Sequence, residues 1–136
     1  MKPVILIPTY NESVAIVELL QQLSTLHNAR DFDVIVLDDN SPDKTADIVD
    51  NLHHDWVRVL RRPGKAGLGA AYRAGFDRVL ELSKYSHVIT MDADGSHRVE
   101  DLPAMMSPVQ CLGFSQSLPL FVLCRRQTLD GGDKSN

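Results

Sequence analysis

The chain has 136 residues, of which 43% are hydrophobic and 24% are charged, and its formal net charge is −4. These values are typical of one globular domain, and a net negative chain has no overall basic field to attract nucleic acid. No apolar run reaches the roughly 20 residues that span a bilayer, so we expect no transmembrane helix.

Short apolar runs predict the strands of a sheet. A fully buried parallel strand is a continuous apolar segment rather than an alternating one, and turn-forming residues bound each run. Segments with helical patterns separate the runs, so the order predicts βαβ units, a mostly parallel sheet and helices on its faces. The predicted strands are residues 4–7, 33–37, 57–60 and 87–91.

Helices are predicted between and after these strands. Asn11 is the expected N-cap of the first helix. Ser41-Pro42-Asp43 is the expected start of the second, because proline suits the first turn and aspartate favours the positive end of the helix dipole. The third helix is expected from Gly69 to Lys84, and a fourth begins near Val99.

Acidic residues directly follow the second and fourth predicted strands. Asp38-Asp39 closes the second, and Asp92-Ala93-Asp94 follows the fourth. Parallel sheets bind ligands at the carboxyl ends of their strands, so we expect these carboxylates at one edge. An Asp-x-Asp pair can share a hard divalent cation with substrate phosphates, although the same pattern also occurs in capped turns. In a metal–diphosphate site, Asp94 ligates the metal directly, and Asp92 ligates through water or reaches the sugar.

Two further loops are expected at the same edge. In Pro8-Thr9-Tyr10-Asn11-Glu12, Tyr10 can stack on a base and Glu12 can accept hydrogen bonds, but the motif alone is more simply a capped strand–helix loop. In the glycine-rich segment 61–69, either Lys65 lies beside the base or phosphate, or the glycines let helix and strand pack closely. Charge alone favours a solvated loop edge for the basic residues, Arg58, Arg61, Arg62 and Lys65.

Taken in order, these motifs resemble glycosyltransferase family 2, and more narrowly the polyprenol (dolichol) phosphate mannosyltransferases. The resemblance covers about residues 2–106 and implies a GT-A (Rossmann-like) fold, of which this chain holds the N-terminal, nucleotide-sugar-binding half only. It also implies transfer of mannose from GDP-mannose to a polyprenyl monophosphate, with inversion and with Mg²⁺ or Mn²⁺. The segments that carry it are 8–12, 38–45, 64–72 and 91–97.

The resemblance implies most of the site residues. Lys65 is added to them because of its place in the glycine-rich segment 61–69. Asp92 and Asp94 are the expected catalytic residues, and they are expected to hold the metal with Ser96. The expected nucleotide-sugar contacts are Pro8, Tyr10, Glu12, Leu37, Asp39, Lys65, Asp92, Ala93 and Asp94.

Residues 107–136 depart from the family pattern and are expected to form a divergent, poorly ordered tail after the sugar-binding region 1–106. We interpret this as truncation or a frameshifted end, which leaves the activity of the chain alone open. A lipid acceptor implies that the protein is cytoplasmic and makes peripheral contact with the cytoplasmic face of a membrane.

Other functions fit parts of the same pattern. A family member could use UDP-glucose or another nucleotide sugar with a saccharide acceptor, and the chain could be a non-catalytic nucleotide-binding fragment. A Rossmann dehydrogenase is disfavoured because the first turn, residues 8–12, has no glycine.

Overall fold

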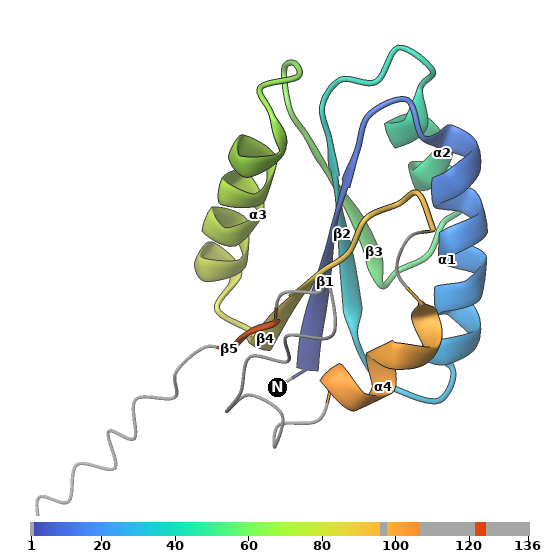
Figure 1. The fold of residues 1–136 in the computed structure, drawn as a ribbon, viewed down its shortest axis with the longest axis vertical. Coiled ribbons are helices and arrows are strands. Elements are labelled where there is room, and N and C mark those ends of the chain that lie inside the picture. The colour runs from blue at the N-terminus through green and yellow to red at the C-terminus, as the bar shows by residue number, and fades with distance from the viewer. Residues whose placement is uncertain (1, 96–97, 107–121, 125–136) are drawn as a thin grey trace, which may run out of the picture.

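A computed structural model describes residues 2–95, 98–106 and 122–124 of the chain, whose centre is one sheet with the strand order β3-β2-β1-β4-β5 (Figure 1). Strands β1 to β4 pair in parallel, which confirms the predicted α/β class. Strand β5, which no sequence pattern predicted, lies antiparallel to β4. The strands are β1 Lys2–Thr9, β2 Asp33–Asp38, β3 Val57–Arg61, β4 Tyr85–Thr90 and β5 Val122–Cys124.

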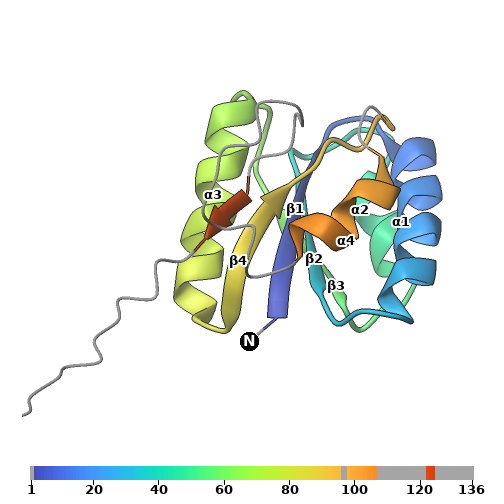
Figure 2. The same cartoon turned by 60° about the horizontal axis from the view of Figure 1, so that its bottom comes forward.

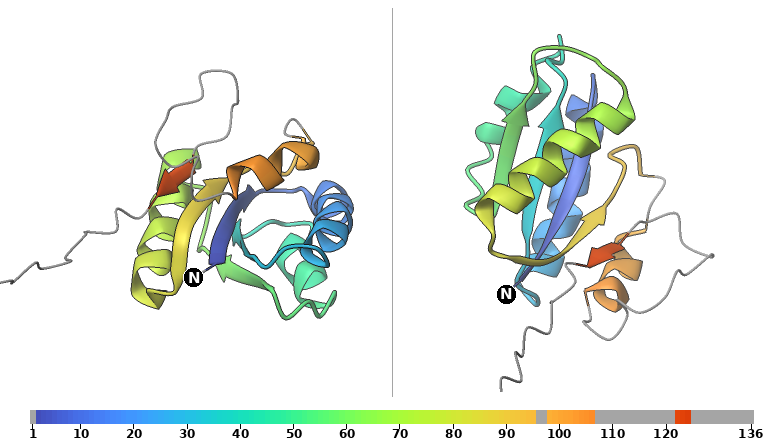
Figure 3. Two further views of the ribbon diagram at one scale, coloured as in Figure 1. Left: turned by 90° about the horizontal axis from the view of Figure 1, so that it is seen from below. Right: turned by 90° about the vertical axis from the view of Figure 1, so that its left-hand side faces the viewer.

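Helices cover both faces of the sheet. Helix α3 lies on one face, and α1, α2 and α4 lie on the other, so the described part of the chain has three layers (Figures 1 and 2). The end-on view in Figure 3 shows the sheet between these two layers. The helices are α1 Ser13–His27, α2 Thr45–Asp50, α3 Leu68–Leu82, the short 3₁₀ helix η1 Val99–Asp101, and α4 Leu102–Met105.

The strands alternate their side chains between two apolar clusters, as a pleated backbone requires. In β1, Ile5 and Ile7 belong to the cluster on the α1 side, whereas Val4 and Leu6 belong to the cluster on the α3 side. All of them are fully buried. On the α3 side, a Cβ at Gly75 would stand 2.9 Å from a methyl carbon of Leu6, so this glycine permits a close approach of helix and sheet.

Strand order places a topological switch beside β1. The chain builds outward from β1 through β2 to β3, and then returns through α3 to place β4 on the other side of β1. The connections on the two sides of β1 therefore leave in opposite directions, which opens a crevice at the carboxyl ends of the strands. This edge is where ligands bind in open α/β sheets.

The predicted helix starts are wrong at two positions. Asn11 is not an N-cap: it has a φ of 52°, and α1 begins at Ser13 without a side-chain cap. Helix α2 begins at Thr45 rather than within Ser41-Pro42-Asp43. The reason is tertiary: the Asn11 backbone N–H donates to Ser41 Oγ over 3.1 Å, and the Ser13 backbone N–H donates to Asp43 Oδ2 over 3.1 Å. Ser41 therefore joins two loops, whereas Asp43 accepts from the first backbone N–H of both helices, that of Thr45 also over 3.1 Å.

No helix within residues 2–95 and 98–106 is long and apolar enough to cross a bilayer. The tail predicted over residues 107–136 lies outside the described residues, apart from β5.

Candidate functional site

A cavity of about 310 Å³ opens at the carboxyl edge of the sheet. Its walls come from the segments that follow β1, β2, β3 and β4, so the motifs predicted to share one edge do so. The lining includes all the predicted nucleotide-sugar contacts except one, together with Thr9, Gly67 and Leu68. The predicted residues that line it are Pro8, Tyr10, Glu12, Asp39, Lys65, Asp92, Ala93 and Asp94.

Leu37 is the predicted contact that does not line the cavity. Its side chain is fully buried on the α3 side of the sheet, where it lies against Gly75. The other exception among the predicted site residues is Ser96, the expected metal ligand, which lies outside the described residues.

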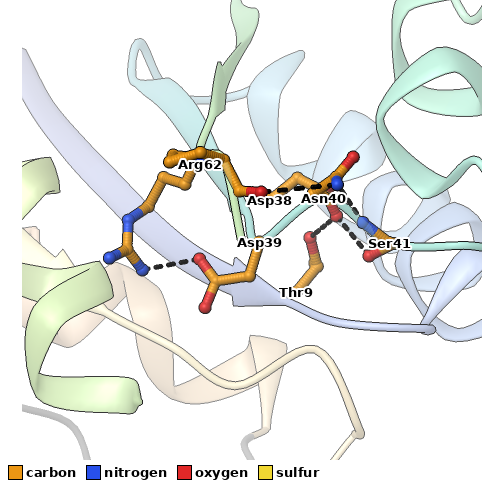
Figure 4. A network of polar contacts seen from close by, with 7 residues as sticks. Thr9, Asp38, Asp39, Asn40, Ser41 and Arg62 are labelled. Atoms are coloured by element: carbon orange, nitrogen blue, oxygen red, sulfur yellow. Dashed lines mark hydrogen bonds and ion pairs between the residues drawn. The ribbon is translucent and has the colours of Figure 1, made fainter. Parts of the chain in front are cut away.

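A buried carboxylate ties the first two loops of the edge together. Asp38 is 3% exposed and accepts hydrogen bonds from Thr9 Oγ1 at 2.9 Å and from Ser41 Oγ at 2.6 Å (Figure 4). The Ser41 backbone N–H donates to the other carboxylate oxygen over 3.1 Å. Bonds to an ionised acceptor are the stronger kind. Asp38 therefore fixes the loops after β1 and β2 relative to each other.

Asp39 lines the cavity and forms an ion pair with Arg62, which does not line it. Arg62 Nη1 lies 2.6 Å from Asp39 Oδ1, and the two side chains are 13% and 8% exposed. The expectation of a solvated loop edge is therefore wrong for Arg62. It holds for the preceding Arg61, whose half-exposed side chain pairs with Asp47 and Asp50. Adjacent arginines of one basic run thus have different surroundings.

Tyr10 and Lys65 both line the cavity and contact each other. Lys65 Nζ lies 4.6 Å from the centroid of the Tyr10 ring, which is a cation–π contact. Such a contact is worth about 0.5–1 kcal/mol at an exposed site, so a ligand with a flat base or a phosphate can displace it. The contact places the aromatic and basic groups that the sequence selected within reach of one ligand.

One part of the cavity wall carries carboxylates. Burial raises the pKa of Glu12, and the negative charges of Asp94 and Asp92 raise it further, against a lowering hydrogen bond from the Tyr10 backbone. The charges of both aspartates therefore reach Glu12, and the wall is an electronegative surface. Within the described parts of the chain, no three His, Cys, Asp or Glu residues are arranged to hold a metal ion by themselves. Asp92 and Asp94 nevertheless offer hard oxygen donors suited to Mg²⁺ or Mn²⁺ when phosphate oxygens complete the shell.

Tyr72 is a neighbour of this wall that the sequence did not single out. Burial raises the pKa of Tyr72 to about 12, with a further contribution from the charge of Asp92. In the sequence, Tyr72 has the spacing of an ordinary packing residue of α3. Helical spacing shows that a side chain faces the sheet, but it does not show which strand end the side chain lies near.

Comparison with known proteins gives a family match and named relatives. A family model described as glycosyl transferase family 2 matches residues 4–131, a range that extends past the last motif, residues 91–97. A polyprenol monophosphomannose synthase from Mycolicibacterium smegmatis is 40% identical over 79% of this chain and 41% of its own length. An undecaprenyl-phosphate mannosyltransferase from Micrococcus luteus is 44% identical over 81% of this chain and 45% of its length. A dolichyl-phosphate β-glucosyltransferase from Trichomonas vaginalis is 29% identical over 96% of this chain and 40% of its length.

Solved structures show the same fold. A mannosyltransferase from Pyrobaculum calidifontis, in complex with GDP-mannose and Mn²⁺, superimposes with a TM-score of 0.61 at 24% identity, over 76% of this chain and 30% of that one. A glucosyl-3-phosphoglycerate synthase from Mycobacterium tuberculosis, in complex with Mn²⁺, UDP and glucosyl-3-phosphoglycerate, superimposes with a TM-score of 0.59 at 23% identity. The match covers 79% of this chain and 39% of that one.

These matches establish both the fold and the family. The chain spans less than half the length of the curated relatives it matches. Its sheet has the GT-A architecture, of which it contains the N-terminal half. The chain belongs to glycosyl transferase family 2, the class of enzymes that transfer sugars.

Proposed function

We propose that this chain forms the donor-binding half of a glycosyltransferase that moves mannose from GDP-mannose to a polyprenyl monophosphate. One observation carries the proposal: a single cavity joins Asp39 with Asp92 and Asp94, so nucleoside and diphosphate groups can be bound side by side. The two lipid-phosphate mannosyltransferases among the relatives support the choice of sugar and acceptor.

The nucleoside end of the donor lies between the loops after β1 and β2 in this proposal. Tyr10 supplies a flat ring for the base, and Asp39 accepts a hydrogen bond from an N–H or hydroxyl group. Lys65 leaves the Tyr10 ring and turns to the diphosphate, where its positive charge is more strongly stabilised. Pro8 and Glu12 complete the nucleoside end. Leu37, which is fully buried and does not line the cavity, stays a prediction from the family resemblance.

The sugar–diphosphate end lies against Asp92, Ala93 and Asp94. Asp92 and Asp94 would hold Mg²⁺ or Mn²⁺, with Ser96 as a proposed further ligand. The metal, when bound, neutralises the charge that develops on the departing nucleoside diphosphate. The solved relatives that hold Mn²⁺ with a nucleotide or nucleotide sugar support this assignment. The electronegative wall also requires a cation before a diphosphate can approach it favourably.

The chemistry that remains for the chain is positioning. The anomeric carbon passes through an oxocarbenium-like state, and a direct in-line attack by the acceptor inverts its configuration. A phosphate monoester is already largely dianionic near neutral pH, because its second pKa is about 6. The acceptor therefore needs no general base. We assign Asp92 and Asp94 to leaving-group stabilisation and sugar orientation, and the reaction to a peripheral position at the cytoplasmic face of a membrane, where the lipid acceptor lies.

A second donor has one observation in its favour. The glucosyltransferase from Trichomonas vaginalis aligns with 96% of this chain, a larger share than the mannosyltransferases do. None of the cavity residues distinguishes mannose from glucose by its residue type. UDP-glucose, with the same lipid phosphate or with a saccharide acceptor, is therefore the alternative donor.

A transfer assay tests the proposal. The purified chain is incubated with Mn²⁺, a polyprenyl phosphate and either labelled GDP-mannose or labelled UDP-glucose, and lipid-extractable sugar is counted. We expect label from GDP-mannose only, with the anomeric configuration opposite to that of the donor. Asp94→Ala should abolish the signal, and the exposed Asp31→Ala should leave it unchanged. Label from UDP-glucose alone would establish the alternative donor. Donor binding without transfer would reduce the role of this chain to nucleotide-sugar binding.

A further inference from the structure

We propose that Arg62 is a positioning residue that holds Asp39 in the orientation that reads the nucleobase of the donor. Arg62 does not line the cavity, whereas Asp39 does. The inference rests on the donor site proposed above and adds to it a residue that was not among the predicted site residues. It names the class of ligand selected: a nucleoside diphosphate whose base carries a ring N–H group.

The contact between the two side chains is short, mostly shielded from solvent and directional. Arg62 Nη1 binds Asp39 Oδ1 at 2.6 Å. Figure 4 shows the other carboxylate oxygen directed away from the guanidinium. A guanidinium donates in a fixed plane, so it sets the rotation of the carboxylate as well as neutralising it. One Asp39 oxygen is thereby committed to the protein, and the carboxylate cannot turn freely to meet a ligand.

The backbones of both residues are also fixed. The Arg62 backbone N–H donates to the Asp38 carbonyl oxygen over 2.8 Å, and the Asp39 backbone N–H donates to the Thr9 carbonyl oxygen over 3.2 Å. The ends of β1, β2 and β3 are thus joined in one hydrogen-bonded row. Neither partner of the ion pair can shift without breaking that row, which makes the orientation of Asp39 a property of the sheet edge.

A fixed carboxylate selects among bases. An ionised carboxylate only accepts hydrogen bonds. Guanine and uracil present a ring N–H to such an acceptor, whereas adenine and cytosine present a ring nitrogen lone pair beside their amino group, which repels a carboxylate oxygen. A carboxylate that could rotate would discriminate less between bases, because its oxygens could move away from the ring nitrogen lone pair of adenine or cytosine and so avoid the repulsion. Arg62 therefore contributes to base selection through Asp39 and without touching the ligand.

Electrostatics give Arg62 a second effect at the same place. The cavity already contains the carboxylates of Glu12, Asp92 and Asp94. Without Arg62, the buried Asp39 would lack its cationic partner, which is costly in a poorly solvated position. The Asp39 side chain would then rotate toward solvent or a cation, away from the base.

Isothermal titration calorimetry in the presence of Mn²⁺ tests the inference. The probes are GDP, UDP, ADP and inorganic pyrophosphate, which has no base. The variants are Arg62→Met, Asp39→Asn and the double mutant, with Arg61→Met as the matched control. We expect Arg62→Met to weaken GDP binding about tenfold to a hundredfold, the range of a charge-assisted hydrogen bond, and to reduce the preference for GDP over ADP. Pyrophosphate binding should change by less than about threefold, and Arg61→Met should change none of the affinities.

The double mutant separates positioning from general destabilisation. If Arg62 acts through Asp39, Arg62→Met should have less than about a threefold effect on GDP affinity once Asp39 is already asparagine. If Arg62→Met fails to fold, Arg62→Lys serves in its place: it keeps the charge but loses the planar donor, so it should lower the GDP preference while the thermal midpoint stays near that of Arg61→Met.

Two results would overturn the inference. One is an equal loss of GDP and pyrophosphate affinity in the Arg62 variants, and the other is losses that add in the double mutant. A wild-type chain that binds pyrophosphate with Mn²⁺ but none of GDP, UDP and ADP would instead refute the donor site itself, and the inference with it.

Discussion

Removing the carboxylate of Asp38 should destabilise the protein more than any change to an exposed acid. Asp38 is 3% exposed, and its partners Thr9 and Ser41 are 3% and 9% exposed. Asp38→Ala removes the acceptor for two hydroxyl groups and one backbone N–H. A hydrogen bond to a charged group contributes about 1.5–3 kcal/mol, and three of them are not additive because water can enter the space left. We therefore expect a loss of about 3–5 kcal/mol in the free energy of unfolding.

Asp38→Asn tests the same network more finely. Its amide oxygen can still accept from the Thr9 and Ser41 hydroxyls, but its NH₂ group faces the Ser41 backbone N–H, so two donors meet. The expected loss is about 1.5–3 kcal/mol, the contribution of one charged hydrogen bond.

Urea denaturation followed by fluorescence of Trp56, the single tryptophan, measures both losses. Asp31→Ala is the control, because the Asp31 side chain is 76% exposed and its ion pair with Lys2 spans 3.7 Å. That variant should lose less than about 1 kcal/mol. If Asp38→Ala loses no more than Asp31→Ala, the account of how the first two loops are held is wrong.

Further predictions concern packing and pH. Gly75→Ala should lower stability by about 1–2 kcal/mol, because its Cβ would stand 2.9 Å from methyl carbons of Leu6 and Leu37 and this overpacking exceeds the gain in helix propensity. Gly69→Ala, in the same helix with open space around it, should raise stability by up to about 1 kcal/mol, and equal effects at the two sites would contradict the packing described. Burial opposes ionisation of Asp43, but hydrogen bonds from Thr45 and Ser13, the first residues of α2 and α1, lower the pKa of Asp43 below its usual 3.8. The ionised form is therefore favoured in the folded state, so this stability is present above pH 3.8 and is lost as the pH falls below that value. Asp43→Asn should thus be less stable than the wild type at pH 7, and the difference should shrink in acid; a difference that is constant with pH would refute this.

The strand and helix order was predictable because buried strands and amphipathic helices have different apolar patterns. The position of the cavity was also predictable, since parallel strands bring their carboxyl ends to one edge. The starts of α1 and α2 were not, because the polar residues that usually cap helices, Asn11 and Ser41, here bond across two loops. Nothing in the sequence distinguished the partly buried Arg62 from the exposed Arg61, because the exposure of each side chain depends on its surroundings at the strand end.

Leu37 illustrates a limit of a different kind. The family resemblance placed it at the nucleoside, yet its side chain points to α3 together with that of Ile35. The two-residue period of a strand was enough to assign that direction once the face of Ile35 was known. A motif therefore fixes where the backbone lies more reliably than which way each side chain turns.

The central claim is that the carboxyl edge of this sheet binds a nucleoside diphosphate together with a divalent metal. Calorimetric titration of GDP into the purified chain, with and without Mn²⁺, tests it most directly. We predict binding that requires Mn²⁺, is lost in Asp94→Ala and survives in Asp31→Ala. GDP binding of equal strength without the metal, or undiminished in Asp94→Ala, would contradict the assignment of this edge as the donor site.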